Sequence, residues 1–300
     1  MSRKAPYFLF FLYLMGFMFF LSCGEGGFEP GTIFNAFETS VEERFNESVS
    51  GKTKPLNSPI VNDENNFGFL WITDPHIRTD RRDYFGKLGM FADRNNVGFI
   101  VCSGDLTDSG TRENFNYVNY LVSVNLTVPF YSALGNHDLY GDGWEVFKEL
   151  IGPSVASFSP YSVNQVSNSL FIFIDTAECV VGEEQMDWIE FQLKNSSAKH
   201  KFILSHFCLY DGEFETPTIL CDPDERYRLL SLLKKYQVDY FLCGHKHSAE
   251  KYNIYGTYHI QGGTASAYKS PLNDSAQFYY FQIQGDLVSF EKIYFTELDY

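Results

Sequence analysis

Side chains that could bind metal ions follow five apolar segments of this 300-residue chain. Each segment is a short run of large hydrophobic residues, which predicts a buried strand. Because the carboxyl ends of parallel strands meet at one edge of a sheet, we expect the side chains that follow them to converge. The candidate site residues are Asp74, His76, Asp105, Asn136, His137, Asp138, His206, His245 and His247.

Carboxylate oxygen and neutral imidazole suit metal ions such as Fe, Mn and Zn, and one carboxylate can bridge two ions. Five of the seven histidines lie in these strand-end clusters. Asp74 and His76 are two residues apart, so both can face one ion. The other two histidines, His200 and His259, are interpreted as surface or strand residues without a site role.

From residue 67 onward, strand-like and helix-like segments alternate, which indicates an α/β fold. The expected strands cover residues 67–73, 97–103, 129–134, 170–174, 201–205 and 240–243. The expected helices cover residues 81–95, 113–123, 144–151, 183–195 and 225–236. After residue 256, short apolar runs separated by Gly, Asn and Asp predict hairpins that close a sheet.

The composition excludes some functional classes. Hydrophobic residues make up 44% of the chain and aromatic residues 18%, so it is not mainly disordered. The net charge of -15 argues against general nucleic-acid binding, because proteins that bind nucleic acid present basic surfaces. A small phosphate ester remains a compatible substrate, since bound metal ions dominate the local field.

The N-terminus has the features of a targeting segment. Arg3 and Lys4 precede a run of 15 mostly apolar residues, 7–21, which is too short for a typical membrane-spanning helix. The following Ser22-Cys23-Gly24 resembles a bacterial lipoprotein cleavage site, with residues 1–22 removed and lipid added to Cys23. We therefore expect an exported lipoprotein anchored to a bacterial membrane, on the periplasmic or cell-surface side. The alternatives are ordinary cleavage, which would give a secreted protein, and an uncleaved anchor.

Residues 23–66 are interpreted as the lipidated cysteine followed by a linker and lead-in. Within this segment, Phe34, Phe37, Val41 and Phe45 recur at helical spacing. This pattern predicts one short helix that docks on the domain.

Five cysteines follow Cys23, and an odd number cannot form a complete set of disulfides. Cys102 and Cys243 lie in apolar runs and are interpreted as small buried side chains. Cys208 and Cys221 flank a loop, and an exported compartment would permit a bridge between them. The sequence leaves open whether that bridge forms.

The site motifs together resemble the calcineurin-like metallophosphoesterase superfamily, in the family's order. They are Asp74-Pro75-His76, Gly104-Asp105-Leu106-Thr107-Asp108, Gly135-Asn136-His137-Asp138, His206 and Gly244-His245-Lys246-His247. The resemblance implies a four-layer α/β/β/α sandwich of two mixed β-sheets flanked by helices, as a single catalytic domain over residues 67–300. The small cyclic-nucleotide phosphodiesterase branch is the most similar part of the family.

The resemblance also implies roles for the site residues. Asp105 would bridge two metal ions, His137 would protonate the leaving group, and Asp138 would orient His137. Asp108 would hold the metal ligands in place without binding a metal ion itself, or else would only cap a helix. The implied ligands of the first ion are Asp74, His76, Asp105 and His247, and those of the second are Asp105, Asn136, His206 and His245.

Two cations about 3.5 to 4 Å apart acidify a water molecule and stabilise charge on phosphoryl oxygens. The predicted function is dinuclear hydrolysis of phosphate esters by a metal-activated hydroxide, with His137 as general acid. A phosphodiester is favoured because acids in the loop after His206 would repel highly charged substrates. These acids are Asp211, Glu213, Glu215, Asp222 and Asp224.

Three other functions fit less of the pattern. One is a phosphomonoesterase of the same fold. Another is a non-catalytic, metal-stabilised surface lipoprotein that binds a partner. The third is a mononuclear zinc hydrolase, which would need only about three protein ligands, fewer than this chain supplies.

Overall fold

The computed structural model describes residues 39–163, 165–212, 216, 218–268 and 274–299. The predicted signal peptide, the lipidation site Cys23, and residues Phe34 and Phe37 lie outside the described residues. Within the described part of the chain, no helix is both long and apolar enough to cross a membrane.

Two mixed β-sheets form the centre of the domain. The first has the order β11-β10-β1-β2-β3. Strands β1, β2 and β3 pair in parallel, and β10 pairs antiparallel with both of its neighbours, β1 and β11. Its strands are β1 (Asn66–Ile72), β2 (Val97–Cys102), β3 (Phe130–Ser132), β10 (Gln277–Gln284) and β11 (Leu287–Tyr294). The second has the order β4-β5-β6-β7-β9-β8, with antiparallel strands at both edges. Its strands are β4 (Ala156–Phe158), β5 (Ser169–Phe173), β6 (His200–Leu204), β7 (Tyr240–Cys243), β8 (Glu250–Ile254) and β9 (Thr257–Gln261).

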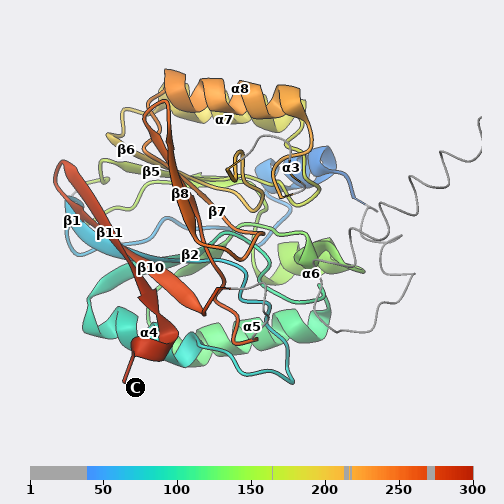
Figure 1. Cartoon of the computed structure of the whole chain (residues 1–300), viewed down its shortest axis with the longest axis vertical. Coiled ribbons are helices and arrows are strands. Elements are labelled where there is room, and N and C mark those ends of the chain that lie inside the picture. The colour runs from blue at the N-terminus through green and yellow to red at the C-terminus, as the bar shows by residue number, and fades with distance from the viewer. Residues whose placement is uncertain (1–38, 164, 213–215, 217, 269–273, 300) are drawn as a thin grey trace, which may run out of the picture.

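Helices cover the outer faces of both sheets (Figure 1). Apolar side chains of α4 (Phe85–Arg94) and α5 (Arg112–Asn125) pack on the first sheet. Those of α7 (Glu183–Asn195) and α8 (Pro223–Lys235) pack on the second. The result is the predicted α/β/β/α sandwich, which the structure confirms. The other helices within the described residues are α3 (Val41–Val49), α6 (Gly143–Leu150) and two short 3₁₀ turns, His137–Leu139 and Phe295–Glu297.

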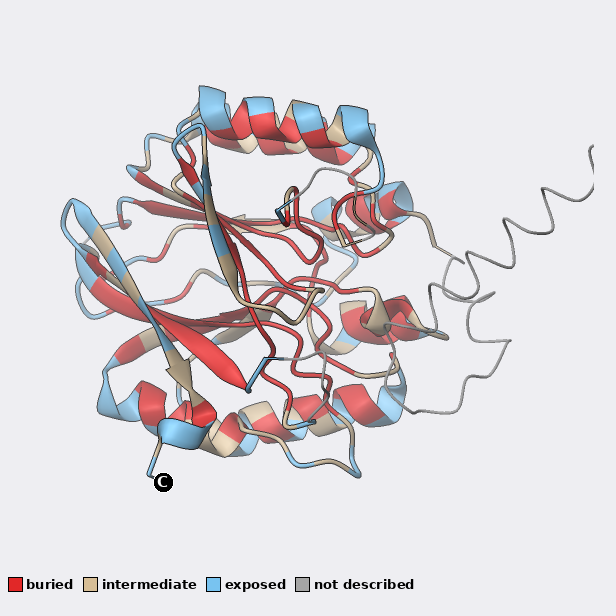
Figure 2. Ribbon diagram, viewed as in Figure 1, coloured by how far each residue is buried: buried red, intermediate tan, exposed pale blue. Residues whose placement is uncertain are grey.

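Aromatic side chains fill the space between the sheets, and the central strands that carry most of them are buried (Figure 2). The ring of Phe69 on β1 stacks on Phe281 with centroids 4.8 Å apart. It also meets Phe171 and Phe202 of the other sheet edge-on, at 5.0 and 5.3 Å. Such contacts add to the apolar burial and fix the two sheets face to face. The strand ends of both sheets are thereby held beside each other.

The lead-in helix α3 docks on the domain, as predicted. Val41 and Phe45 are buried, and Phe45 meets Trp188 of α7 at 6.3 Å. Arg44, for which the sequence gives no signal, is fully buried and bonds Asp175, two residues after β5, at 2.8 Å. Asp175 therefore anchors the lead-in helix.

The disulfides correct the interpretation of the cysteines. Cys208 does not pair with Cys221: the bonds are Cys179–Cys221 and Cys208–Cys243, with Cα atoms 5.3 and 5.4 Å apart. Cys208 follows β6 and Cys243 is the last residue of β7. The two cysteines meet because these strands are parallel neighbours. Cys243 is therefore buried but bonded, and among the described cysteines Cys102 remains a free, buried thiol.

Two short edge strands, β4 and β8, were not predicted. β4 has only three residues, and β8 is mostly polar and half-buried or exposed, so both give a weak signal compared with the apolar central strands. His200 and His259 lie in strands, on β6 and β9, and both are buried rather than at the surface.

Candidate metal centre

All seven candidate ligands lie just beyond the C-terminal ends of strands. Asp74 and His76 follow β1, Asp105 follows β2 and Asn136 follows β3. From the second sheet, His206 follows β6, and His245 and His247 follow β7. The structure brings their ligand atoms together in two adjoining clusters.

The first cluster contains Asp74, His76, Asp105 and His247, whose ligand atoms all lie within 4.8 Å of one another. The Nε2 atoms of His76 and His247 are 3.0 Å apart. His247 Nε2 is 3.2 Å from an Asp74 oxygen, and His76 Nε2 is 3.6 Å from Asp105 Oδ2.

The second cluster contains Asp105, His206 and His245, joined by Asn136. The Asn136 side-chain oxygen lies 2.9 Å from His206 Nε2 and 3.0 Å from His245 Nδ1. Asp105 Oδ2 is 3.4 Å from His206 Nε2. The same oxygen of Asp105 thus faces both clusters, which is the geometry of a bridging carboxylate.

The donors fit cations of the Fe, Mn or Zn type. Several ring nitrogens face one another at hydrogen-bond distance, and a cation between them would satisfy all of their lone pairs. Burial, followed by the charge of His137, lowers the pKa of His76 to about 3. Burial, followed by the charge of His206, also lowers the pKa of His245 to about 3. Both rings are therefore neutral, which is the form that binds metal.

The carboxylates give the site its attraction for positive charge. Burial opposes a charge on His206, but the neighbouring Asp105 carboxylate raises the pKa of His206 to about 9. Burial likewise opposes ionisation of Asp105, but the charge of His206 holds the pKa of Asp105 well below its usual value. The second cluster thus favours a cation, whether a proton or a metal ion.

Backbone strain is concentrated at the candidate ligands. Among the described residues, nine non-glycine residues have positive φ angles, and five of them are candidate ligands. They are Asp74, His76, Asp105, His245 and His247. Such conformations cost free energy and cluster at functional sites. The packing beside Asp105 is also close enough to require glycine, since a Cβ on Gly135 would lie 2.1 Å from the backbone nitrogen of Asp105.

The candidate general acid His137 stands beside the first cluster, with its ring 4.6 Å from that of His76. Its backbone amide donates to Asp105 Oδ1 at 2.8 Å, and its Nδ1 lies 2.8 Å from the carbonyl oxygen of Asp108. A carbonyl can only accept, so Nδ1 carries a hydrogen and Nε2 is the nitrogen available for proton exchange.

The role predicted for Asp138 is wrong. Both of its carboxylate oxygens accept hydrogen bonds from the loop after β2 and from Gly135. The donors are the backbone amides of Leu106, Thr107 and Gly135 and the hydroxyl of Thr107. Burial and the charge of Asp105 raise the pKa of Asp138 to about 7, whereas the amide hydrogen bonds lower it. Asp138 holds the two ligand loops together, and the backbone of Asp108 orients His137.

Asp108 supports the first cluster rather than capping a helix. Thr111 is the residue that caps α5. An Asp108 oxygen lies 3.7 Å from His76 Nδ1, on the side of the ring away from Asp105. Arg78 and Arg81 bind Asp108 at 3.3 and 3.2 Å, contacts for which the sequence offers no signal beyond their nearness to His76.

Two of the described acids after His206, Asp211 and Asp222, have partners within the fold. Asp222 caps α8, where its carboxylate accepts from the backbone amides of Asp224 and Glu225. Asp211 is buried, with a carboxylate oxygen 3.7 Å from Lys246 Nζ. Glu213 and Glu215 lie outside the described residues. The sequence-based reason for favouring a diester is therefore weakened.

Two further residues position the histidines. The ring of Phe207 stacks on His245 with centroids 4.0 Å apart. The hydroxyl of Thr176, after β5, accepts hydrogen bonds from the backbone amides of His206 and Phe207. Neither role could be found from the sequence, because both depend on which strands are neighbours.

Comparisons with known proteins agree with this geometry. Residues 67–249 match the family described as calcineurin-like phosphoesterase. Purple acid phosphatase 4 of Arabidopsis thaliana is 24% identical over 224 residues, which cover 62% of this chain and 63% of that protein. The probable glycerophosphodiester phosphodiesterase GpdQ of Arcobacter nitrofigilis is 29% identical over 203 residues, covering 59% and 70%. The chain thus spans less than two thirds of the length of the plant phosphatase.

Solved structures show the same fold. Purple acid phosphatase PPD1 from yellow lupin seeds has a TM-score of 0.61 and 18% identity, covering 80% of this chain and 53% of that chain. GAP50, described as the anchor in the inner membrane complex of Plasmodium, has a TM-score of 0.62 and 18% identity, covering 77% and 85%. The family match covers more than half of the chain. The chain therefore belongs to the calcineurin-like phosphoesterase family.

Proposed function

We propose that this protein hydrolyses phosphate esters with two bound metal ions, and that phosphodiesters are its favoured substrates. The observation that carries the proposal is the pair of donor clusters that share one oxygen of Asp105. When bound, two such ions acidify a water molecule and stabilise charge on the phosphoryl oxygens. Fe, Mn and Zn all suit this mixture of nitrogen and oxygen donors.

His137 is proposed to protonate the leaving oxygen. Its Nδ1 is held by the Asp108 carbonyl, so Nε2 is the atom that gives up the proton. The backbone amide of His137 binds Asp105, which ties the position of the proposed acid to that of the bridging carboxylate.

The preference for a diester rests on charge. The net charge of -15 disfavours multiply charged anions. Arg78 and Arg81 are also already paired with Asp108, and Lys246 with Glu250. The similarity to GpdQ supports the same choice. A phosphomonoesterase is the second candidate, supported by the similarity to purple acid phosphatase 4.

We also propose that the protein is exported and anchored by lipid on Cys23. The N-terminal sequence and the two disulfides support an oxidising compartment. Growth of a bacterial expression host with radioactive palmitate should label the wild type and not Cys23→Ala. Equal labelling of both proteins would contradict the lipid anchor.

The catalytic proposal is tested with the full-length protein loaded with Mn, Fe or Zn. We expect metal-dependent hydrolysis of bis(p-nitrophenyl) phosphate to exceed that of p-nitrophenyl phosphate. For esters with poor alkoxide leaving groups, His137→Ala should lower kcat about 10² to 10⁴-fold, because the leaving oxygen then lacks a proton donor. The loss should be smaller for a p-nitrophenolate leaving group, which needs little protonation. A protein that binds two ions but hydrolyses neither ester would instead favour the non-catalytic, partner-binding alternative.

A further inference from the structure

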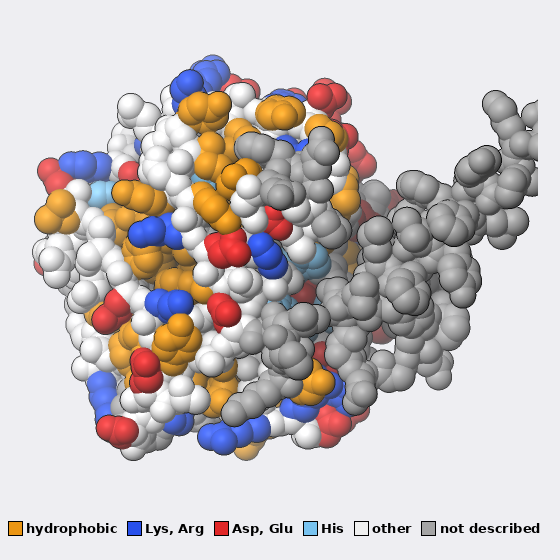
Figure 3. Space-filling model, viewed as in Figure 1, with side chains coloured by type: hydrophobic (Ala, Val, Ile, Leu, Met, Phe, Trp, Pro, Cys, Tyr) orange, Lys and Arg blue, Asp and Glu red, His pale blue; other side chains and the backbone are white. Residues whose placement is uncertain are grey.

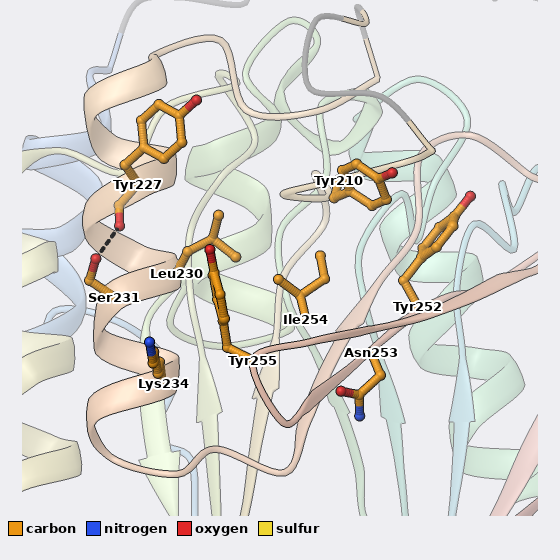
Figure 4. A pocket seen from close by; sticks show the side chains of 9 residues that line it. All are labelled: Tyr210, Tyr227, Leu230, Ser231, Lys234, Tyr252, Asn253, Ile254 and Tyr255. Atoms are coloured by element: carbon orange, nitrogen blue, oxygen red, sulfur yellow. Dashed lines mark hydrogen bonds between the residues drawn. The ribbon is translucent and has the colours of Figure 1, made fainter.

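A hollow of about 610 Å³ lies between helix α8, strand β8 and the segment after His206. Four tyrosines line it: Tyr210, Tyr227, Tyr252 and Tyr255. Figure 4 shows Tyr227, Leu230 and Lys234 of α8 on one side of the hollow and Tyr210 and Tyr252 on the other. The walls are therefore mostly aromatic and aliphatic, with one cation, Lys234, 4.6 Å from the ring of Tyr255.

A chain of hydrogen bonds links the segment that carries His245 and His247 to the hollow. Lys246, which separates His245 from His247 in the sequence, bonds the Asp211 carbonyl and Glu250, both at 3.2 Å. Glu250 also accepts the hydroxyl hydrogen of Tyr252, which lines the hollow. On the face shown in Figure 3, histidine side chains appear beside a lysine, with a group of hydrophobic side chains next to them. A ligand that binds the metals could therefore extend into the hollow.

Tyr255 is an unfavourable residue for its backbone position. It occupies the hairpin turn between β8 and β9 with a φ of +54°, followed by Gly256 at +98°. Asparagine or glycine is preferred at such a position, because a large side chain is strained there. Its side chain is 70% exposed, so burial does little to offset the strain. The conformation of the turn thus favours asparagine over tyrosine, whereas a ligand-binding role favours tyrosine.

We propose that the hollow binds a planar aromatic ring carried by the organic group of the phosphate ester. This inference rests on the proposed function for the link between ring and phosphate. Tyrosine faces stack well on planar rings, and Lys234 can donate to an acceptor atom on the ring's edge. The same lysine disfavours a cationic ligand such as a quaternary ammonium group, which aromatic cages otherwise bind.

Two phosphonates of equal charge and with the same butyl chain, one of which carries a terminal phenyl ring, test the proposal on the full-length, metal-loaded protein: 4-phenylbutylphosphonate and butylphosphonate. We expect the phenyl compound to inhibit ester hydrolysis about tenfold more strongly than butylphosphonate, because stacking of its ring on an aromatic side chain adds affinity of that order. In Tyr255→Asn this ratio should fall below about threefold, while the thermal unfolding midpoint stays equal or rises because asparagine suits the turn. Loss of the preference without loss of stability separates ligand binding from folding.

A matched pair of alanine variants serves as the control. Tyr227 lines the hollow and Tyr120 on α5 does not, yet their side chains are similarly exposed, at 58% and 57%. Tyr227→Ala should reduce the phenyl preference and Tyr120→Ala should leave it unchanged. A ratio near one in the wild type, or an unchanged ratio in Tyr255→Asn, would overturn the proposal.

Saturation-transfer NMR with 4-phenylbutylphosphonate separates the two proposals, because it needs no turnover. Suppose that the protein hydrolyses no phosphate ester, but its contacts with the phenyl ring disappear in Tyr255→Asn. This result would support ring binding in the hollow and overturn the proposed function. Normal hydrolysis of phosphate esters without contacts to the phenyl ring would overturn only the proposal that the hollow binds the ring.

Discussion

The Cys208–Cys243 disulfide joins the two segments that carry His206 and His245. Cys208 follows His206 by two residues, and Cys243 precedes His245 by two residues. The bond spans neighbouring parallel strands, β6 and β7, at the edge where the candidate ligands gather. It therefore limits how far two ligands of the second cluster can separate.

Removing this bond should affect both stability and metal binding. Cys208→Ser/Cys243→Ser opens a loop with a sequence separation of 35, so we expect the free energy of unfolding to fall by about 3 kcal/mol. Metal affinity, measured by competition with a chelator, should fall as well. Cys179→Ser/Cys221→Ser is the control, with a separation of 42 and no cysteine within two residues of a candidate ligand. It should lose similar stability but keep its metal affinity, and an equal loss of affinity in both variants would contradict this role.

Arg44 should anchor the lead-in helix strongly. Arg44→Met leaves the buried carboxylate of Asp175 without its cation, so we expect a loss of about 3 to 5 kcal/mol in urea unfolding. The double variant Arg44→Met/Asp175→Asn should recover part of this lost stability, because its buried side chain at position 175 carries no charge. Arg112→Met removes an exposed ion pair with Glu149 and should cost less than about 1 kcal/mol. Similar losses of unfolding free energy in Arg44→Met and Arg112→Met would show that the buried ion pair stabilises the fold no more than the exposed one.

His259 should make the fold sensitive to acid. It packs on Phe241, and neither of its ring nitrogens has a hydrogen-bond partner among the residues that the structure describes. Burial lowers the pKa of His259 from 6.5 to about 4, so the unfolded chain takes up the proton more readily than the folded chain. Stability is then lost as pH falls from 6.5 toward 4, by about 3 kcal/mol in total for this residue.

The variant His259→Phe should keep its stability at pH 7.5 and lose less of it at pH 5 than the wild type does. Urea unfolding at the two pH values measures the difference, and the other titrating groups cancel in the comparison between proteins. Identical acid losses in both proteins would refute the assignment.

Asp138 should act on structure rather than on the proton of His137. In Asp138→Asn, an NH₂ group would face backbone amides that now donate to the carboxylate. We expect a loss of about 2 kcal/mol or more in unfolding free energy, with an unchanged pH profile of hydrolysis. Asp142→Asn nearby, where the side chain makes no cap hydrogen bond, is the control. An unchanged stability with a shifted pH profile would restore the orienting role.

The strands and candidate ligands could be predicted because one local pattern specifies both. An apolar run such as Phe99 to Cys102 reads as a buried strand, and the Gly104-Asp105 that follows it marks the functional edge. The order of the strands is not a local property. The sequence therefore offered Cys221, which lies nearby in the chain, as a possible partner of Cys208 and gave no sign of Cys243 on the adjoining strand.

Contacts between distant segments were missed for the same reason. The pairing of Arg44 with Asp175 spans 131 residues, and the sequence shows only a cation in one helix and an acid after one strand. Asp138 follows His137 directly, and this adjacency suggested a shared role. Its side chain instead lies against Leu106 and Thr107, which only the folded loops bring near.

The bridging role of Asp105 is the central claim, and the metal content of purified variants tests it most directly. Elemental analysis of the wild type should give two ions per chain. His247→Ala should retain the second ion and His206→Ala the first, whereas Asp105→Asn should lose both. One ion per chain in the wild type, or two ions retained by a folded Asp105→Asn, would contradict a centre built around a shared carboxylate.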